Sequence, residues 1–374
     1  MRATGPDDPL VRLRRARVVA VRAARPGAVE LAVEVDGSPA AALAYPSLTG
    51  PVVEGDVVVL NTTAASLGLG TGGFHLVVAV EGGPDVDVAH PGRLMKARYT
   101  PLQAAVPSVE ETHGELLDAS RGLSGTPVVA APLHSMIGPI AAGAKTSGGA
   151  RVVYVMTDGA ALPGAFSRLV PRLRGNGLLD GFITTGQAFG GEMEAATLWT
   201  GLLAAREVLE AEVIVVADGP GNLGTATKWG VSALANGHAL NAAEILRGRP
   251  VAALRVSFAD PRERHHVVSH HSLTILAEVC TIRANVAVPS LTDEQQRAAV
   301  WDALRLHGLE DRHQLVDVTG QPALDELERR GFEIESMGRT PADDPAFFLA
   351  AGAAGVLAGR MAANSRRYGT ATER

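Results

Sequence analysis

The first part of the chain alternates apolar and polar positions in short runs. Residues 29–45, VELAVEVDGSPAAALAY, place apolar side chains from Val29 to Val35 on one face, with Glu30 and Glu34 on the other. Asp36-Gly37 interrupts this run, and this pair is typical of a tight hairpin turn. Together with VVEGDVVVLN and FHLVVAV, the pattern predicts a small antiparallel, β-barrel-like domain over residues 1–100.

From about Thr126 the pattern changes to short β-branched runs separated by longer helical segments. One helical segment, TDEQQRAAVWDALRLHG, has Thr292 as its predicted N-cap and Gln295 in the capping-box position. The alternation predicts an α/β domain over residues 101–374, in one lobe or two lobes, with a mostly parallel, doubly wound (Rossmann-like) sheet. A β/α barrel is the alternative. The predicted strands are TPVVAA, RVVYVMT, GFITT, EVIVVA, VAALRVSF, NVAVP, HQLVDV and FEIES, and GEMEAATLWTGLLAAREVLE is a further predicted helix.

Composition narrows the class of protein. The 374 residues carry a net charge of −6, which disfavours a general nucleic-acid binder because such proteins usually have a basic face. The single cysteine, Cys280, excludes a disulfide within the chain and favours a cytoplasmic protein, with Cys280 in the core. FFLAAGAAGVLAGRMAA predicts a helix packed inside the protein or against a second copy, not a membrane span.

In parallel α/β sheets, ligands bind beyond the carboxyl ends of the strands, so the residues that follow each strand are candidates. Asp158 and Asp218 each follow a predicted strand and precede a glycine. Each carboxylate can bind Mg²⁺ or a hydroxyl, accept a reacting proton, or simply form a turn. His134 follows the first α/β strand and is a candidate substrate contact or a hydrogen-bonding partner.

A glycine motif follows the strand EVIVVA. Gly219, Gly221 and Gly224 form G-x-G-x-x-G between a predicted strand and a predicted helix, which is the setting in which backbone N–H groups approach a phosphate. Thr225 and Lys228 can add hydroxyl and cationic contacts. The acidic residue expected about 20 residues on for a ribose contact is missing, because Glu244 lies in the middle of a predicted helix and Asp260 comes too late. Phosphate or nucleotide binding and a structural turn are therefore both open.

The segment DPRERHHVVSHHSLTIL concentrates histidines and arginines. Ser269 is the predicted N-cap of a helix whose first turn holds two of the histidines, where the helix dipole disfavours imidazolium. Neutral imidazoles and guanidinium groups suit an anionic substrate, with acid–base catalysis as a further role. The same histidines can ligate a metal together with Asp158 or Asp218, or serve as structural hydrogen-bonding groups. The candidates are His265, His266, His270, His271, Arg262 and Arg264.

GPGNLGTATKWG and RVSFADPRERHHVVSHHSLTIL resemble the bacterial domain of unknown function (DUF) 3866 family. GRLMKARYTPLQ, LHSMIGP and YVMTDGAALP are also similar to its patterns, so the resemblance covers most of the chain. It implies that these loops belong together, and that Lys96, Arg98 and Tyr99 form either a wall of the cleft or a packing contact. It implies no reaction and no catalytic roles.

Three hypotheses follow. The first is an enzyme that binds a phosphorylated or nucleotide-like small molecule, with phosphate at the glycine loops and a histidine as general acid–base. The second is a metal-dependent hydrolase that uses the histidines and aspartates as ligands of a divalent ion. The third is a non-catalytic binding or assembly protein. The first two expect His270, Asp158, Asp218 and Gly221 to converge in one pocket.

Overall fold

A computed structural model describes residues 8–70, 72–89, 92–225 and 227–368 of the chain. The chain divides into two compact units. The first comprises residues 1–91 with 97–105, and the second comprises residues 92–96 with 106–374. The two short strands β6 (Leu94–Lys96) and β7 (Ala104–Val106) follow the barrel strands in the sequence.

The first unit is a closed five-stranded barrel in the part of the chain that the structure describes, as predicted. Every neighbouring pair is antiparallel except β3 and β5. Leu31 and Val33 lie in its core, whereas Glu34 is exposed, as the alternation predicts. The elements are β1 (Leu13–Arg25), β2 (Ala28–Val35), β3 (Ser38–Ala44), α1 (Pro46–Thr49), β4 (Val57–Asn61), α2 (Thr63–Ser66) and β5 (Phe74–Val80).

The hairpin between β2 and β3 turns where the sequence indicates. Asp36 and Gly37 both have positive φ, 51° and 72°. Two consecutive residues of this kind are what a two-residue turn with the right-handed twist of the strands requires.

The second unit contains an open parallel sheet. Among the described residues it has eight strands in the order β11-β10-β9-β12-β8-β13-β16-β17, and every neighbouring pair is parallel. The prediction of a doubly wound sheet is therefore confirmed. The barrel alternative is wrong, because β11 and β17 are free edges. The strands are β8 (Pro127–Ala130), β9 (Val152–Thr157), β10 (Gly181–Thr185), β11 (Met193–Ala195), β12 (Val213–Asp218), β13 (Arg249–Ala253), β16 (Asn285–Pro289) and β17 (Gln314–Val318).

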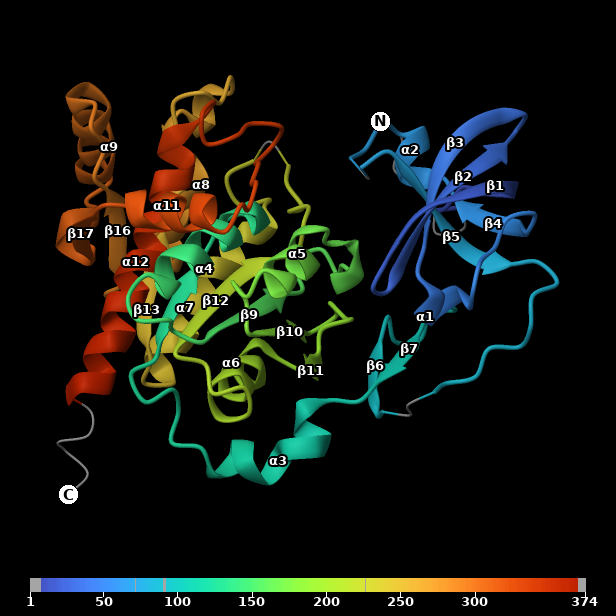
Figure 1. Ribbon diagram of the computed structural model, residues 1–374, viewed down its shortest axis with the longest axis horizontal. Helices are drawn as coiled ribbons and strands as arrows, with labels where there is room; N and C mark the ends of the chain where they lie inside the picture. The colour runs from blue at the N-terminus through green and yellow to red at the C-terminus, as the bar shows by residue number, and fades with distance from the viewer. Residues whose placement is uncertain (1–7, 71, 90–91, 226, 369–374) are drawn as a thin grey trace. The chain divides into compact units, whose positions relative to one another are not determined.

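Helices cover both faces of this sheet (Figure 1). Tyr154 and Met156 of β9 pack into one layer, and Val153 and Val155 pack into the other, because side chains alternate along a strand. One face carries α4 (Ile137–Lys145), α5 (Leu169–Gly175), α11 (Gln321–Arg329) and α12 (Pro345–Tyr368). The other carries α3 (Val109–Ala119), α6 (Leu198–Glu207), α7 (Ala235–Ile245), α8 (His270–Thr274), α9 (Glu294–Leu306) and α10 (Leu309–Arg312).

Short elements lie in the loops between these strands and helices. β14 (Val256–Ser257) and β15 (Val267–Val268) form a small antiparallel ribbon after β13. The remaining turns are η1 (His134–Met136), η2 (Gly164–Phe166), η3 (Ser232–Leu234), η4 (Glu263–His265) and the π-helical turn η5 (Ile275–Val279), which continues α8.

The apolar segment near the end of the chain forms α12, as predicted. Among the described residues, α12 is the one helix long and apolar enough to cross a membrane, yet 78% of its apolar window is buried inside the protein. It packs against α4 at very short range, since a Cβ placed on Gly355 would lie 2.1 Å from the carbonyl oxygen of Ile140. This burial identifies α12 as a core helix.

Four local predictions are wrong. FEIES forms no strand; Phe332 and Ile334 pack into the core from an irregular segment. VAALRVSF is broken between β13 and β14, and GEMEAAT contains β11, so that α6 begins only at Leu198. The N-cap of α9 is Asp293, whose carboxylate accepts from the Gln296 N–H at 3.0 Å, and not Thr292. Cys280 is fully buried, as predicted.

Candidate functional site

The strand order defines where the sheet opens for a ligand. The chain runs outward from β9 to β11 on one side and from β13 to β17 on the other, with β12 and β8 between them. The chain that leaves β8 continues to the β9 side of the sheet, whereas the chain that leaves β12 and β13 continues to the other side. The loops at the carboxyl ends of these strands therefore diverge at this point. In open α/β sheets this is the usual place for a binding crevice.

A pocket of about 390 Å³ lies among these loops. Its volume is in the range of sites that hold a small molecule. Residues from the exits of β8, β12 and β13 share it with one residue that follows α11 in the sequence. The lining residues are Pro132, Leu133, Asn222, Leu223, Gly224, Thr225, Val231, Arg255, Arg262, Arg264, His265, His271 and Met337.

The glycine motif forms a hairpin loop and does not lead directly into a helix. Gly224 pairs with Val231 in an antiparallel bridge, and the Thr225 N–H donates to the carbonyl of Gly230 at 2.7 Å. The following helix, α7, begins only at Ala235. The predicted helix N-terminus at Gly224 is therefore wrong, and the motif lacks the dipole that usually supports phosphate binding.

The hairpin loop is nevertheless held beside the exit of β8. The Asn222 side chain donates from Nδ2 to the carbonyl of Pro132 at 2.8 Å. Gly221 has a φ of 128°, a backbone conformation that side chains disfavour, so this glycine is required for the turn itself. The contact places Gly224 and Thr225 on the pocket wall.

The histidine segment folds around Ser269, which is fully buried. Ser269 is the N-cap of α8, as predicted, and its Oγ accepts from the His271 N–H at 3.4 Å. The same Oγ lies 2.8 Å from Nδ1 of His265, four residues earlier. One serine therefore joins η4 to the first turn of α8.

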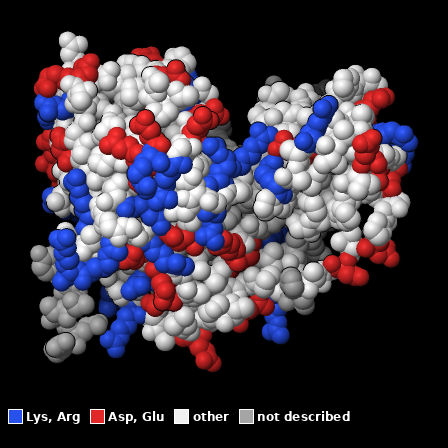
Figure 2. Space-filling model, in the orientation of Figure 1, with Lys and Arg blue, Asp and Glu red and all other residues white. Residues whose placement is uncertain are grey.

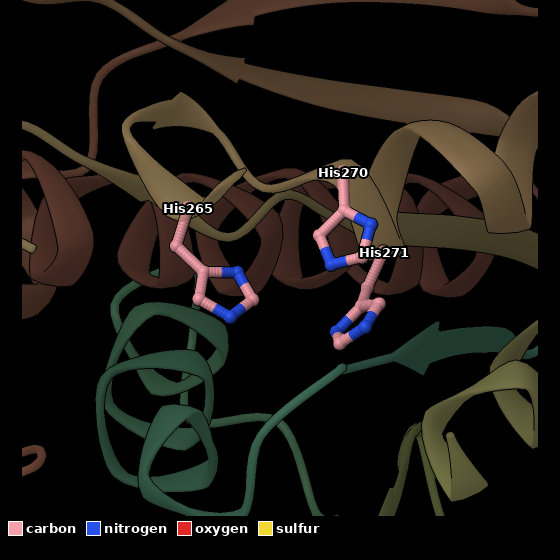
Figure 3. A group of neighbouring side chains, drawn as sticks. All are labelled: His265, His270 and His271. Carbon is pink, nitrogen blue, oxygen red and sulfur yellow. The ribbon is translucent and has the colours of Figure 1, made fainter. Parts of the chain in front are cut away.

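This arrangement gathers His265, His270 and His271, whose potential ligand nitrogens all lie within 4.8 Å of one another. Figure 3 shows the three rings directed toward a common space, His265 from η4 and the other two from the start of α8. The ring centroids of His270 and His271 are 3.9 Å apart. We refer to these three residues as the histidine trio.

The histidine trio is neutral at physiological pH. Burial, followed by the charges of Arg255 and Arg262, lowers the pKa of His265 to about 3. Burial likewise lowers the pKa of His271 to about 4 and lowers that of His270. The helix dipole predicts that His270 and His271 are neutral, and in the structure desolvation is the largest cause of their lowered pKa values.

A cluster of arginines adjoins the trio. Asp260 has a fully buried side chain that accepts from Arg255 and Arg262, each at 2.8 Å through Oδ2, and lies 3.7 Å from Arg339. These guanidinium groups hold the pKa of the Asp260 carboxyl well below its usual range, Arg262 having the largest effect. Arg264 donates from Nε to Nε2 of His265 at 3.4 Å.

The loops that line this pocket lie within residues 41–355, which match the family model described as Protein of unknown function (DUF3866). The chain belongs to the DUF3866 family. No curated protein matches it. The resemblance implies that several loops belong together, and the pocket of this DUF3866 protein brings together residues of GPGNLGTATKWG, RVSFADPRERHHVVSHHSLTIL and LHSMIGP.

Positively charged side chains outnumber negatively charged ones among the residues that line the pocket. Over the drawn face of this DUF3866 protein, Lys and Arg side chains commonly lie beside acidic ones (Figure 2). Arg255 and Arg262, which line the pocket, share Asp260, whereas Arg339 pairs with Asp344 at 3.2 Å and lies 3.7 Å from Asp260; no ion pair with Arg264 occurs within the described ranges. An excess of positive charge at a concave site favours an anionic ligand.

Several predicted site residues do not reach the pocket. His266 is exposed and packs edge-on against Phe258, so it lies outside the histidine trio. Lys228 forms an ion pair with Glu278 and is not among the residues that line the pocket. Asp158 is exposed and accepts from the backbone N–H of Gln187 at 3.2 Å. The expected convergence of Asp158 with the histidines is therefore wrong.

His134 belongs to a buried hydrogen-bond network. Its Nδ1 lies 3.2 Å from the hydroxyl of Tyr154, and its Nε2 lies 2.8 Å from Oγ of Ser167. The Tyr154 hydroxyl in turn donates to the carbonyl of Asp218 at 3.0 Å. Both ring nitrogens of His134 therefore have a partner within this hydrogen-bond network. This indicates a structural role for His134 and not a ligand contact.

Asp218 and Gly219 are also buried beneath the pocket and do not line it. Oδ1 of Asp218 accepts from the hydroxyl of Thr157. Gly219 lies against Met156 and Leu162, and a Cβ at this position would lie 3.1 Å from both side chains. Asp218 is therefore a candidate for stabilising the ends of β9 and β12, and the structure does not bring it to the histidine trio.

Lys96 was singled out by the resemblance, and it is an internal anchor of the second unit. Its Nζ donates to the carbonyls of Gly186 and Ala188 at 2.6 and 2.9 Å, and lies 3.2 Å from a carboxylate oxygen of Glu194. Burial raises the pKa of Glu194 against the opposing effect of Lys96. This ion pair fixes the loop after β10.

Arg255, Asp260 and Arg339 are the site residues that the sequence did not single out. Arg255 lies inside the apolar run VAALRVSF, and an arginine in such a run was the available signal. Asp260 precedes Pro261, and in the sequence this pair indicates only a turn. Arg339 comes from a loop about 80 residues later, and no local pattern marks it.

Proposed function

We propose that this protein is a cytoplasmic enzyme that binds a phosphorylated small molecule in the pocket between the hairpin loop and the histidine trio. The observation that carries the proposal is that Arg255, Arg262 and Arg264 line one pocket together with Thr225. Guanidinium groups donate paired hydrogen bonds that match the oxygens of a phosphate.

The arginines divide into two kinds. Arg255 is buried and held by Asp260, and burial lowers its pKa to about 10, so its position is fixed before a ligand arrives. Arg262 and Arg264 are more exposed, and Arg264 has only a long contact to His265 within the described part of the chain. We assign Arg264 as the principal phosphate contact, with Arg255 as a fixed source of positive potential.

The neutral imidazole of His271 supports the same assignment. It lines the pocket, and a neutral ring can donate a hydrogen bond to a phosphate oxygen without needing a proton from solvent. A group with a pKa near 4 is a weak base and is deprotonated at neutral pH, which disfavours a general-acid role. The hydrogen-bonding role of His271 is therefore favoured over acid–base catalysis.

The hairpin loop narrows the class of ligand. Because no helix begins at Gly224, the G-x-G-x-x-G segment does not supply the pyrophosphate cradle of dinucleotide-binding proteins. A pocket of about 390 Å³ is also at the small end of the range for ligand sites. We infer a compact phosphorylated molecule in preference to a dinucleotide.

Isothermal titration calorimetry with inorganic phosphate, ribose 5-phosphate and AMP tests the proposal. We expect at least one to bind wild-type protein and Arg264→Gln to weaken that binding about 10- to 100-fold, because a charge-assisted hydrogen bond contributes about 1.5–3 kcal/mol. Lys228→Gln is the matched control, since it removes a cation from the hairpin loop outside the pocket. Binding of none of the three ligands, or equal losses in both variants, would contradict the proposal.

A further inference from the structure

We propose that His265, His270 and His271 bind one divalent transition-metal ion of the zinc class through their Nε2 atoms. The three rings come from η4 and the first turn of α8, and Figure 3 shows them facing one space. One ring nitrogen from each histidine can be chosen so that the three lie within 4.8 Å of one another. No function assigned above uses all three rings together.

The hydrogen bonds of the histidine trio identify the ligand atoms. Nδ1 of His265 is engaged by Ser269 at 2.8 Å, which leaves Nε2 as the coordinating nitrogen. Nε2 of His270 and Nε2 of His271 are buried from solvent and have no hydrogen-bond partner among the residues described. Buried polar atoms nearly always have a partner, and one metal ion provides a partner for both.

The geometry of the histidine trio suits such an ion after small ring rotations. Tetrahedral zinc with Zn–N bonds of about 2.1 Å holds its nitrogens about 3.4 Å apart. Arg264 donates to Nε2 of His265, so the ring proton is assigned to Nδ1, where Ser269 Oγ can accept it, and Nε2 carries the lone pair. Three histidines leave a fourth coordination position for water or a substrate oxygen.

The chemistry of the histidine trio also selects the kind of ion. Neutral imidazoles favour zinc and neighbouring transition metals, whereas Mg²⁺ and Ca²⁺ require oxygen ligands. Asp158 and Asp218, which we expected to complete a metal site, make their contacts elsewhere. The proposed ligand set is therefore three nitrogens, without a carboxylate.

The nearby arginines couple this ion to an anion. The positive charges of the pocket arginines, Arg255, Arg262 and Arg264, repel a divalent cation. An anion that contacts both the ion and Arg264 offsets this repulsion. Coordination of His265 Nε2 also displaces the Arg264 contact at 3.4 Å and frees that guanidinium. This coupling rests on the proposed phosphate binding, whereas metal binding itself does not.

Metal binding is tested on chelator-treated, full-length protein. Titration with Zn²⁺ and with Co²⁺ is expected to show one ion per chain, and bound Co²⁺ to give visible absorption bands of a low-coordinate nitrogen site. His270→Ala and His271→Ala are expected to abolish both. The matched control is His266→Ala, which removes an exposed histidine of the same loop and is expected to bind normally.

Folding of each variant is checked by circular dichroism, and the Co²⁺ spectrum of wild-type protein decides the question even where a variant does not fold. Absence of saturable binding of both ions by wild-type protein would overturn the proposal. Unchanged binding in folded His270→Ala and His271→Ala would overturn it equally.

The coupling is tested with methylphosphonate, a soluble phosphate analogue that does not precipitate zinc. Zn²⁺ is expected to tighten methylphosphonate binding at least tenfold, and methylphosphonate to tighten Zn²⁺ binding by the same factor, since linkage is reciprocal. If phosphate compounds bind without any metal site, the proposed function stands and the metal site fails. If metal binds and no phosphate compound does, the metal site stands and the proposed function fails.

Discussion

At the scale of single residues, Asp260 shows how one carboxylate organises a site. It lies at the Asp-Pro turn after β14, a position that the sequence marks only as a turn. In the structure its buried carboxylate accepts from both Arg255 and Arg262. A buried carboxylate needs such partners. Asp260 therefore fixes the positions of the two arginines, and their guanidinium groups stabilise its ionised form.

We predict that Asp260→Asn lowers the free energy of unfolding by about 3–5 kcal/mol, because it leaves the buried guanidinium of Arg255 without its counter-charge. Denaturant unfolding followed by circular dichroism measures the change. Adding Arg255→Met to Asp260→Asn removes the unpaired charge and should restore part of the loss. A decrease below about 1 kcal/mol in the single variant would show that Asp260 does not support Arg255.

At the scale of elements, the packing of α12 on α4 depends on glycines. A Cβ on Gly355 would lie 2.1 Å from the carbonyl oxygen of Ile140, and one on Gly143 would lie 2.6 Å from that of Gly352. Two helix backbones can approach this closely only where a glycine on one of them has no side chain at the contact. The Gly/Ala-rich sequence of α12 is therefore explained by a contact inside the chain, and it needs no partner subunit.

We predict that Gly355→Ala lowers the free energy of unfolding by about 1–3 kcal/mol, since the added methyl group forces the two helices apart. Gly175→Ala is the control: it also adds a methyl group at a helical glycine, but one with no atom within 4 Å. That change should be neutral or stabilise by up to about 1 kcal/mol. Thermal and denaturant unfolding of both variants distinguish packing from helix propensity, and equal effects would contradict this explanation.

At the scale of the whole molecule, stability should depend on pH through buried neutral histidines. Burial lowers the pKa of His134 to about 4, whereas the unfolded chain has an ordinary histidine pKa near 6.5. Between these values the unfolded state binds a proton that the native state does not. Stability is therefore fully present above about pH 6.5 and is lost as the pH falls toward 4.

We predict that His134 contributes about 3 kcal/mol of this loss, because each pH unit between the two pKa values changes stability by about 1.4 kcal/mol. Unfolding free energies of wild-type protein and His134→Gln, measured from pH 7.5 to 4, give the contribution as a difference. Other buried histidines remain in both proteins and cancel in this comparison. Parallel pH profiles would mean that His134 is not neutral and buried in the native state.

Local patterns in the sequence determined the barrel, the α/β unit and the N-cap of α8. Alternation in residues 29–45 predicted the β2–β3 hairpin because strand periodicity depends on adjacent residues alone. Ser269 predicted the start of α8, and hence the position of His270 and His271, for the same reason. FEIES failed as a strand because burial of Phe332 and Ile334 is satisfied without a strand.

Only the tertiary structure decided which of these residues meet. The order of strands brings Leu133, Gly224, Arg264 and Met337 to one pocket although they are far apart in the sequence. The buried Ser269 joins His265 to the other two members of the histidine trio, whereas the neighbouring His266 lies outside the trio. Local periodicity is set by neighbours along the chain, whereas a binding site is set by long-range packing, so the sequence determined the candidates and the fold selected among them.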